Sequence, residues 1–169
     1  MESKAKLVGH PIHQMLIVFP LGLLATAVIF DGLGSWLGNA QWYQASFYMI
    51  GAGIIGGLAA AIFGLIDWMA IPANTRAKSV GAWHGLGNVL VALLFVGSWV
   101  LRWEMPTSPS GIAMALSLAG VLLTLVTGWL GGELMDRMGV GIDNGADLNA
   151  PNSLTWRAHR PGTPGMHRF

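Results

Sequence analysis

Four long apolar stretches alternate with short polar segments along this chain. The stretches cover residues 12–37, 43–66, 80–101 and 111–132. Each holds the roughly 20 apolar residues that an α-helix needs to cross a bilayer core about 30 Å thick. The pattern therefore predicts an all-α integral membrane protein, a four-helix transmembrane bundle that residues 1–142 form as one domain.

The composition supports a membrane location. Of the 169 residues, 53% are hydrophobic and 10% are charged, whereas about 25% of the residues of a soluble domain are charged. A net charge of +1 does not favour nucleic acid as a partner, so we expect the chain to be surrounded by the lipid bilayer. The sequence contains no cysteine, which excludes thiolate metal ligands, iron–sulfur clusters and c-type haem attachment.

Basic residues flank one end of every apolar stretch. They are Lys4, Lys6, Arg76, Lys78, Arg137, Arg157, Arg160 and Arg168, and only Arg102 lies at the opposite ends. By the positive-inside rule both termini and the central loop face the cytoplasm, and we expect a multi-pass protein of the bacterial inner membrane. Residues 143–169, rich in proline, asparagine and glycine, are expected to form an extended or disordered cytoplasmic tail that contains His159 and His167.

Five ionisable residues gather at the cytoplasmic ends of the predicted helices. They are His10, His13, Asp67, His84 and Glu133. The spacing of His10 and His13 lets both imidazoles lie near one helix face. Ionisable groups in membrane helices are costly and favour a functional interpretation; ion pairs and caps at the interface are the structural alternative.

Two further patterns concern the surroundings of these residues. Glycines surround His84 in residues 81–88, and Asn88 follows one turn later, so the gap admits another helix or a flat cofactor. An inner histidine and a glycine-preceded inner carboxylate also recur in each half of the chain, His13 with Asp67 and His84 with Glu133. This recurrence suggests two parallel helical-hairpin repeats related by an axis along the membrane normal.

Other positions bear on how the helices pack. Stripes of small residues on the second and fourth stretches predict close helix approach, and Pro20 predicts a kink in the first helix. Asp31 lies on the same helix face as His13, five turns away at the outer end. Because apolar residues separate the two, we interpret Asp31 as an interfacial cap rather than a step in a proton path.

The inner cluster offers ligands for two kinds of site. Imidazoles with carboxylates suit a metal ion such as zinc, iron or manganese; the candidates are His10, His13, His84, Asp67 and Glu133. Two imidazoles from different helices suit haem b, with His84 and either His13 or His10 as axial ligands and Asn88 beside the cofactor. Asp67 and Glu133 would then orient the imidazoles through their second nitrogens. The spacing does not decide between these sites, and a cluster without any cofactor is the third option.

A set of motifs resembles an uncharacterised family of four-helix bacterial inner-membrane proteins, a domain of unknown function. The motifs are Gly9-His10-Pro11-Ile12-His13, Phe19-Pro20-Leu21-Gly22, His84-Gly85-x-x-Asn88, Gly128-Trp129-Leu130-Gly131-Gly132-Glu133 and Gly139-Val140-Gly141. The resemblance covers residues 7–142. It points to His10, His13, His84, Asn88 and Glu133. Because relatives are sometimes joined to Rieske-type iron–sulfur domains, the resemblance also implies membrane electron transfer.

Two functional hypotheses follow from these observations. The leading one is a small membrane redox subunit that binds haem b or a metal ion at the cytoplasmic end of the bundle and exchanges electrons with other inner-membrane or redox proteins. The alternative is a non-catalytic accessory or assembly subunit of a larger inner-membrane complex, with no cofactor. Both are favoured over a stand-alone enzyme, and a homodimer is left open.

Two other classes are disfavoured. A transporter is disfavoured because no charged residue lies near the bilayer middle. A hydrolase is disfavoured because the sequence contains neither a Gly-x-Ser-x-Gly nor a His-Glu-x-x-His motif.

Overall fold

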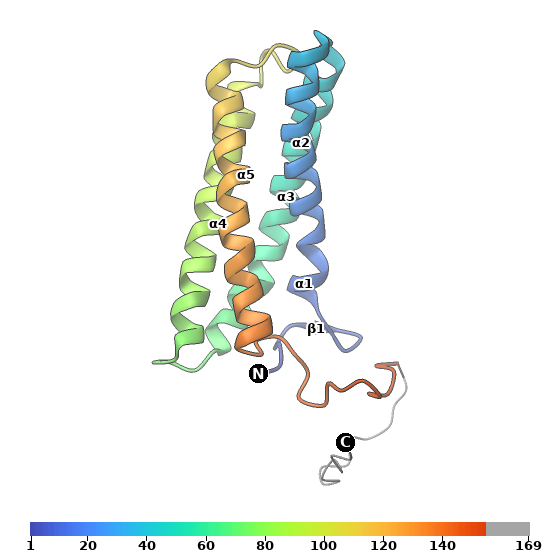
Figure 1. The fold of residues 1–169 in the computed structure, drawn as a ribbon, viewed down its shortest axis with the longest axis vertical. Coiled ribbons are helices and arrows are strands. Elements are labelled where there is room, and N and C mark those ends of the chain that lie inside the picture. Colours follow the sequence, from blue (N-terminus) through green and yellow to red (C-terminus); the bar gives the residue numbers. More distant parts are fainter. Residues whose placement is uncertain (155–169) are drawn as a thin grey trace.

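The computed structural model describes residues 1–154 and forms a long bundle of antiparallel helices (Figure 1). The helices are α1 (Ile12–Leu16), α2 (Val18–Leu37), α3 (Ala40–Ala70), α4 (Arg76–Leu101) and α5 (Gly111–Gly132), and α5 continues into the π-helical turn η1 (Glu133–Arg137). Two short strands, β1 (Lys6–Leu7) and β2 (His10–Pro11), precede α1 and pair antiparallel. Four spans are long and apolar enough to cross a membrane, with α1 and α2 together forming the first. The all-α membrane bundle predicted from the sequence is confirmed.

The helices end where local chemistry terminates them. Gly38 adopts the left-handed conformation, with φ of 63°, immediately after α2, as is common for a glycine after a helix. Side-chain oxygens of Asn39, Thr75 and Ser110 accept hydrogen bonds from main-chain N–H groups in the first turns of α3, α4 and α5. These N-caps satisfy N–H donors that have no partner within the helix, so each of these helices begins at a defined residue.

The first span is broken, as its proline predicts. A break at Ile17 separates α1 from α2, and the main-chain N–H of Ile17 donates to the carbonyl of His13 at 3.1 Å. Pro20 has no N–H to donate to the carbonyl of Leu16, and its ring crowds that carbonyl. His13 lies in α1, on the N-terminal side of this break.

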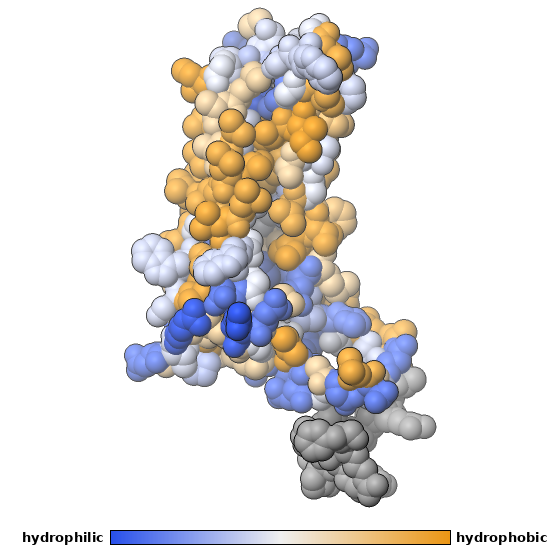
Figure 2. Space-filling model, viewed as in Figure 1, coloured by the Kyte–Doolittle hydropathy of each residue, from blue (hydrophilic) through white to orange (hydrophobic). Residues whose placement is uncertain are grey.

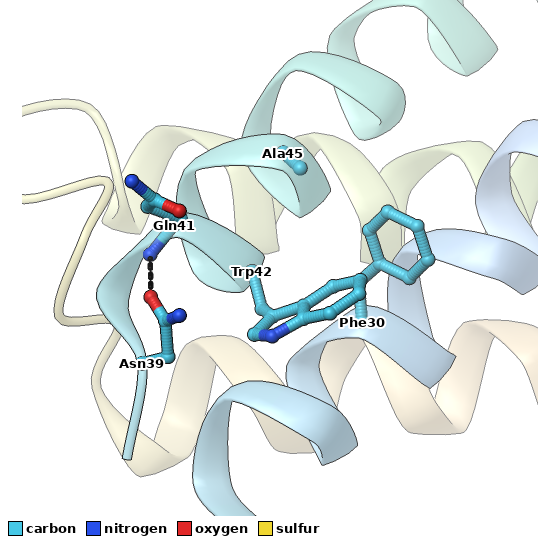
Figure 3. Close-up of a pocket in the computed structure, with 5 residues that line it drawn as sticks. All are labelled: Phe30, Asn39, Gln41, Trp42 and Ala45. Atoms are coloured by element: carbon cyan, nitrogen blue, oxygen red, sulfur yellow. Dashed lines mark hydrogen bonds between the residues drawn. The ribbon is translucent and has the colours of Figure 1, made fainter. Parts of the chain in front are cut away.

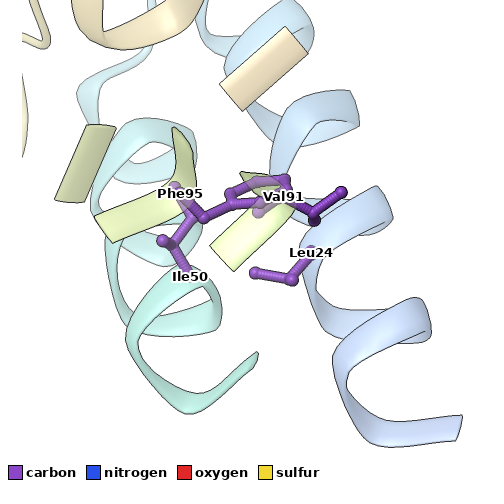
Figure 4. Packing of buried hydrophobic residues seen from close by; sticks show 5 residues of the cluster. Leu24, Ile50, Val91 and Phe95 are labelled. Carbon is purple, nitrogen blue, oxygen red and sulfur yellow. The ribbon is translucent and has the colours of Figure 1, made fainter. Parts of the chain in front are cut away.

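Two helical hairpins make up the bundle. The first span packs along α3 and α4 packs along α5, while α2 against α5 and α3 against α4 join the hairpins more sparsely. Leu24, Ile50, Val91 and Phe95 fill the space between the hairpins at mid-height (Figure 4). Figure 2 shows the outer surface, with hydrophobic residues over the middle of the rod and hydrophilic residues gathered at its ends. The end that carries both chain termini is called the terminal end below, and the opposite end is called the loop end.

Several buried positions of the two hairpins match at a fixed spacing within each pair of equivalent helices. Leu24, Ala27 and Asp31 of α2 are followed 71 positions later by Phe95, Ser98 and Arg102. Ser46, Ile50, Gly53 and Ala60 of α3 are followed 67 positions later by Ala113, Ser117, Gly120 and Thr127 of α5. Equivalent pairs also make equivalent contacts: a Cβ added to Gly53 would lie 2.6 Å from Leu24, and one added to Gly120 would lie 2.7 Å from Phe95. The bundle is therefore built from two copies of one hairpin pattern.

Candidate functional site at the paired histidines

The terminal half of the bundle brings His13 and His84 together. Their ring centroids are 6.4 Å apart and their planes are inclined by 87°. His13 comes from α1 and His84 from α4, so each hairpin contributes one imidazole. The two residues are 71 positions apart, the spacing of the internal repeat. The pair therefore lies where equivalent positions of the two hairpins meet.

Both imidazoles make the same hydrogen bond to the other helix of their own hairpin. Nδ1 of His13 lies 2.8 Å from the carbonyl oxygen of Ala60 in α3, and Nδ1 of His84 lies 2.9 Å from the carbonyl oxygen of Thr127 in α5. A carbonyl oxygen only accepts hydrogen bonds, so in both neutral rings Nδ1 carries the proton and Nε2 has the free lone pair. The arrangement thus fixes the tautomer and leaves two nitrogens able to act as ligands.

Two glycines allow the neighbouring helices to pack closely against the imidazole rings. A Cβ added to Gly64 would lie 2.9 Å from Cε1 of His13, and one added to Gly131 would lie 3.2 Å from Cε1 of His84. These glycines are again 67 positions apart. The small-residue stripes seen in the sequence therefore bring α3 and α5 against the imidazoles as well as against neighbouring helices.

Asn88 distinguishes the two histidines. Its side-chain amide lies 3.3 Å from Nε2 of His84 and donates to the main-chain carbonyl of His84 at 2.8 Å. The hydroxyl of Thr127 donates to Oδ1 of Asn88 at 3.2 Å, which orients the amide. The residue 71 positions before Asn88 is Ile17, which has no polar side chain. His84 is therefore held at both ring nitrogens, whereas within residues 1–154 no side chain hydrogen-bonds to Nε2 of His13.

The other predicted ligands lie apart from this pair and have their own partners. Asp67 accepts hydrogen bonds from the Ser3 hydroxyl at 2.8 Å and from the main-chain N–H of Lys4 at 2.7 Å. Glu133 forms an ion pair with Arg76 at 3.1 Å. Exposed His10 contacts the Ser153 hydroxyl at 3.2 Å. Among residues 1–154, no group of three or more His, Asp or Glu side chains is arranged to hold a metal ion.

The expected role of the carboxylates is corrected by these contacts. Asp67 and Glu133 were expected to orient the imidazoles, but the main-chain carbonyls of Ala60 and Thr127 do so. The physical reason is geometric: Ala60 and Thr127 precede Asp67 and Glu133 by seven and six residues along the chain, about two helical turns, so the imidazoles meet these carbonyls rather than the acids. A main-chain carbonyl that accepts a hydrogen bond cannot be recognised from the sequence of side chains. The repeat does relate Ala60 to Thr127, because these two residues are 67 positions apart.

The segment before α1 packs against the chain after η1 at the terminal end of the bundle. The amino group of Met1 donates to the carbonyl of Gly139 at 2.8 Å, and Lys6 forms ion pairs with Glu2 at 2.9 Å and Asp143 at 3.2 Å. The bond to Glu2 raises the pKa of Lys6, and the same bond lowers the pKa of Glu2. These contacts attach the residues before α1 to the chain that follows η1.

A second polar cluster lies at the loop end, inside the bundle. Arg102 is fully buried and forms a two-pronged ion pair with Asp31, with both N–O distances 2.7 Å. Its remaining donors reach the hydroxyls of Ser46 at 3.3 Å, Ser98 at 3.1 Å and Ser117 at 3.2 Å. One guanidinium therefore connects all four spans. The interpretation of Asp31 as an interfacial cap was wrong, because Arg102, at the equivalent position of the other hairpin, turns inward to meet it.

A shallow surface hollow at the loop end offers less chemistry than the histidine pair. It has a volume of about 240 Å³ and is lined by Phe30, Asn39, Gln41, Trp42 and Ala45 (Figure 3). The Phe30 and Trp42 rings meet edge to face, with centroids 4.8 Å apart. None of these residues is ionisable, so this hollow contains no acid, base or metal ligand of its own. The paired histidines are the stronger candidate site.

The fold and the distribution of apolar surface define the class as an integral membrane four-helix protein. The chain belongs to the family described as "Predicted membrane protein (DUF2231)", whose model matches residues 9–144. That match includes all four spans and both histidines of the pair. Comparisons with curated proteins and with solved structures found no match.

Proposed function

We propose that this protein is a small membrane redox protein in which His13 and His84 bind the iron of a b-type haem. The observation that carries the proposal is the pair itself: two imidazoles from different hairpins, each with Nδ1 on a main-chain carbonyl and Nε2 in the ligating form. Histidines that bind metals commonly donate the other ring N–H to a carbonyl or carboxylate, which fixes the ring and raises its basicity.

The distance between the rings agrees with a shared metal. A bond from a metal to an imidazole nitrogen is about 2 Å long, so imidazoles on opposite sides of one metal have centroids roughly 6 Å apart. The centroids of His13 and His84 are 6.4 Å apart. Haem binding requires both Nε2 atoms to point at the iron, and Asn88 must then give up its contact with Nε2 of His84.

The number of ligands favours haem over a bare metal ion. A zinc ion takes three or four protein ligands, but Asp67, Glu133 and His10 are bound to Ser3, Arg76 and Ser153. Haem needs only the two axial positions from the protein, because the porphyrin supplies the other four ligands. Bound there, the haem would supply one-electron chemistry, and the protein residues would hold and orient it.

The proposed setting is the bacterial inner membrane. The positive-inside rule favours a cytoplasmic terminal end, so the histidines would lie on the cytoplasmic side of the bilayer. The sequence contains no cysteine with which to hold an iron–sulfur cluster. An electron donor or acceptor would therefore be a separate redox protein or a membrane-soluble carrier.

Alanine variants test the assignment of ligands. The full chain is purified in mild detergent after expression with haem precursor, and bound haem is quantified from its visible spectrum. We expect His84→Ala and His13→Ala each to lose most of the haem, since each removes one axial ligand. His10→Ala is the matched control and should retain wild-type haem content, because exposed His10 bonds Ser153 instead. Full haem content in both ligand variants would refute the proposal.

One observation favours an accessory subunit as a second candidate. After η1 the described chain forms only turns, and it presents Leu148 and Leu154 as exposed apolar side chains. Exposed leucines in a segment of this kind suit a protein partner. If the segment is a contact, truncation after Asp143 should reduce co-purification with a partner complex, and the haem spectrum should stay unchanged. Equal recovery of the complex would count against this role.

A further inference from the structure

A hollow of about 270 Å³ lies where α5 continues into η1 at the terminal end, and it is called the α5 hollow below. Its lining residues are Trp129, Gly132, Glu133, Asp136 and Arg137. Their spacing of i, i+3, i+4, i+7 and i+8 is that of one helix face. The volume is below the roughly 300–1,000 Å³ of pockets that enclose whole drug-sized molecules. The α5 hollow therefore suits a small polar group at the end of a membrane span.

The α5 hollow combines both signs of charge. Glu133 and Asp136 are acidic, Arg137 is basic, and Arg76 reaches Glu133 in an ion pair at 3.1 Å. The two acids and the two arginines sum to zero charge. Within residues 1–154, the side chains of Asp136 and Arg137 have no hydrogen-bond or ion-pair partner. An open acceptor for a cation, an open donor for an anion and no net charge together favour a zwitterion over an ion of either sign.

Trp129 gives the α5 hollow an aromatic wall. Its indole is exposed, and its side-chain N–H has no hydrogen-bond partner in the part of the chain that the structure describes. The face of an indole attracts an organic ammonium, and carboxylates accept hydrogen bonds from an ammonium that carries hydrogens. A primary ammonium can use both kinds of contact, whereas a quaternary ammonium has no N–H to donate. The lining therefore favours a primary ammonium.

An apolar stripe leads along α5 to the hollow. Leu118, Leu122 and Leu125 are exposed, and they precede Trp129 along α5 at successive spacings of four, three and four residues. This spacing places them on one helix face, and they are called the leucine stripe below. Figure 2 shows hydrophobic side chains over the middle of the rod and hydrophilic ones at this end. A ligand with a polar head and an apolar chain matches the hollow and the stripe together.

We propose that the α5 hollow binds the headgroup of a zwitterionic phospholipid with a primary ammonium, a phosphatidylethanolamine. The ammonium lies against Trp129 and donates to the carboxylates of Glu133 and Asp136. The guanidinium of Arg137 donates to the phosphate, and one acyl chain follows the leucine stripe. This lipid site does not depend on the proposed haem.

Native mass spectrometry of the full chain in mild detergent measures the binding. Phosphatidylethanolamine, phosphatidylcholine and phosphatidylglycerol with identical acyl chains are titrated separately. Phosphatidylcholine has no ammonium N–H to donate, and phosphatidylglycerol has no ammonium. We therefore expect phosphatidylethanolamine to bind about fivefold more tightly than either, the upper range for exposed ion pairs. Equal affinity for the three lipids would overturn the inference.

Variants separate the contacts of the headgroup. Asp136→Asn should remove most of the preference for phosphatidylethanolamine over phosphatidylcholine, whereas Arg137→Gln should weaken both lipids alike because both carry the phosphate. Trp129→Leu should weaken phosphatidylethanolamine two- to fivefold. Trp83→Leu is the matched control, since Trp83 is a similarly exposed tryptophan of α4 outside the hollow, and it should leave binding unchanged. A full preference for phosphatidylethanolamine in Asp136→Asn would contradict the site.

Free phosphoethanolamine separates a lipid from a soluble source of the same chemistry. It carries the phosphate and the primary ammonium but no acyl chain, so it cannot use the leucine stripe. We expect an equal concentration of it to leave bound phosphatidylethanolamine in place. Displacement of half of the lipid at equal concentration would overturn the lipid assignment and indicate a soluble ligand.

Discussion

At the residue scale, the contacts of Arg102 are unusually complete. The guanidinium has five N–H donors, and they reach Asp31 and the hydroxyls of Ser46, Ser98 and Ser117. A buried charge is tolerated only when it is paired and hydrogen-bonded. Both conditions are met here, which explains how a basic residue at the loop end can turn into the bundle instead of towards water.

Loss of the carboxylate should therefore be costly. In Asp31→Asn the Arg102 charge stays buried without a counter-ion, and breaking a buried ion pair in this way costs about 3–5 kcal/mol. The free energy of unfolding in detergent measures the effect. Glu104→Gln, at an exposed position of the same loop end, is the control and should change stability by less than about 0.5 kcal/mol. Equal unfolding free energies of the two variants would mean that the ion pair does not stabilise the bundle.

At the scale of the helix, glycines determine how closely the elements approach the histidines. A Cβ at Gly64 would meet the His13 ring at 2.9 Å, one at Gly131 would meet the His84 ring at 3.2 Å, and Gly85 has open space within 4 Å. The three glycines lie in helices of similar character, so they form a graded series. The series separates the effect of contact from the effect of helix propensity.

Alanine at these three positions should act in the order of the contacts. Gly64→Ala should displace the His13 ring and reduce haem retention most, Gly131→Ala should reduce it less, and Gly85→Ala should leave it unchanged. Alanine in a helix interior is favoured over glycine by about 1 kcal/mol, so Gly85→Ala should also raise thermal stability. Haem content and melting temperature, measured on the same samples, check both parts. Equal haem retention in all three variants would contradict the close packing.

The helices themselves could be predicted from the sequence, whereas their polar contacts could not. Hydropathy marks each span because membrane insertion depends on local composition, and Pro20 indicates the break at Ile17 because its effect is local as well. The pairing of Asp31 with Arg102 depends on which faces of distant helices meet. Each residue viewed alone resembles an ordinary interfacial charge. Only the shared spacing of 71 positions, which also relates His13 to His84, connects them in the sequence.

At the scale of the whole molecule, the two hairpins are arranged as pseudo-equivalent halves. The histidines meet at the terminal end and the Asp31–Arg102 pair meets at the loop end, each pair formed by equivalent positions. Between them lies the apolar core of Leu24, Ile50, Val91 and Phe95 (Figure 4). The polar pairs thus fix the register of the hairpins at both ends, and within residues 1–154 the apolar core separates the two polar pairs.

The equivalence predicts that the ion pair can be reversed. In the double variant Asp31→Arg with Arg102→Asp, the charges exchange places between equivalent positions, so we expect recovery of a large part of the stability that either single change removes. Recovery should be incomplete because Ser46 is matched by Ala113 and Ser98 by Ala27, which alters the hydroxyls around the moved guanidinium. A double-mutant cycle of unfolding free energies measures the coupling. Additive losses would argue against pseudo-equivalent halves.

The most direct test of the central claim is the electron paramagnetic resonance spectrum of the oxidised full chain purified in detergent. The claim is that His13 and His84, whose ring planes are inclined by 87° in this structure, would together hold one haem iron. Near-perpendicular imidazoles give low-spin ferric iron a strongly anisotropic signal, which differs from the ordinary rhombic signal of parallel rings. We predict that anisotropic signal in the wild type and its loss in His84→Ala. A protein that contains no haem iron, or a low-spin signal that persists in both His13→Ala and His84→Ala, would contradict the account.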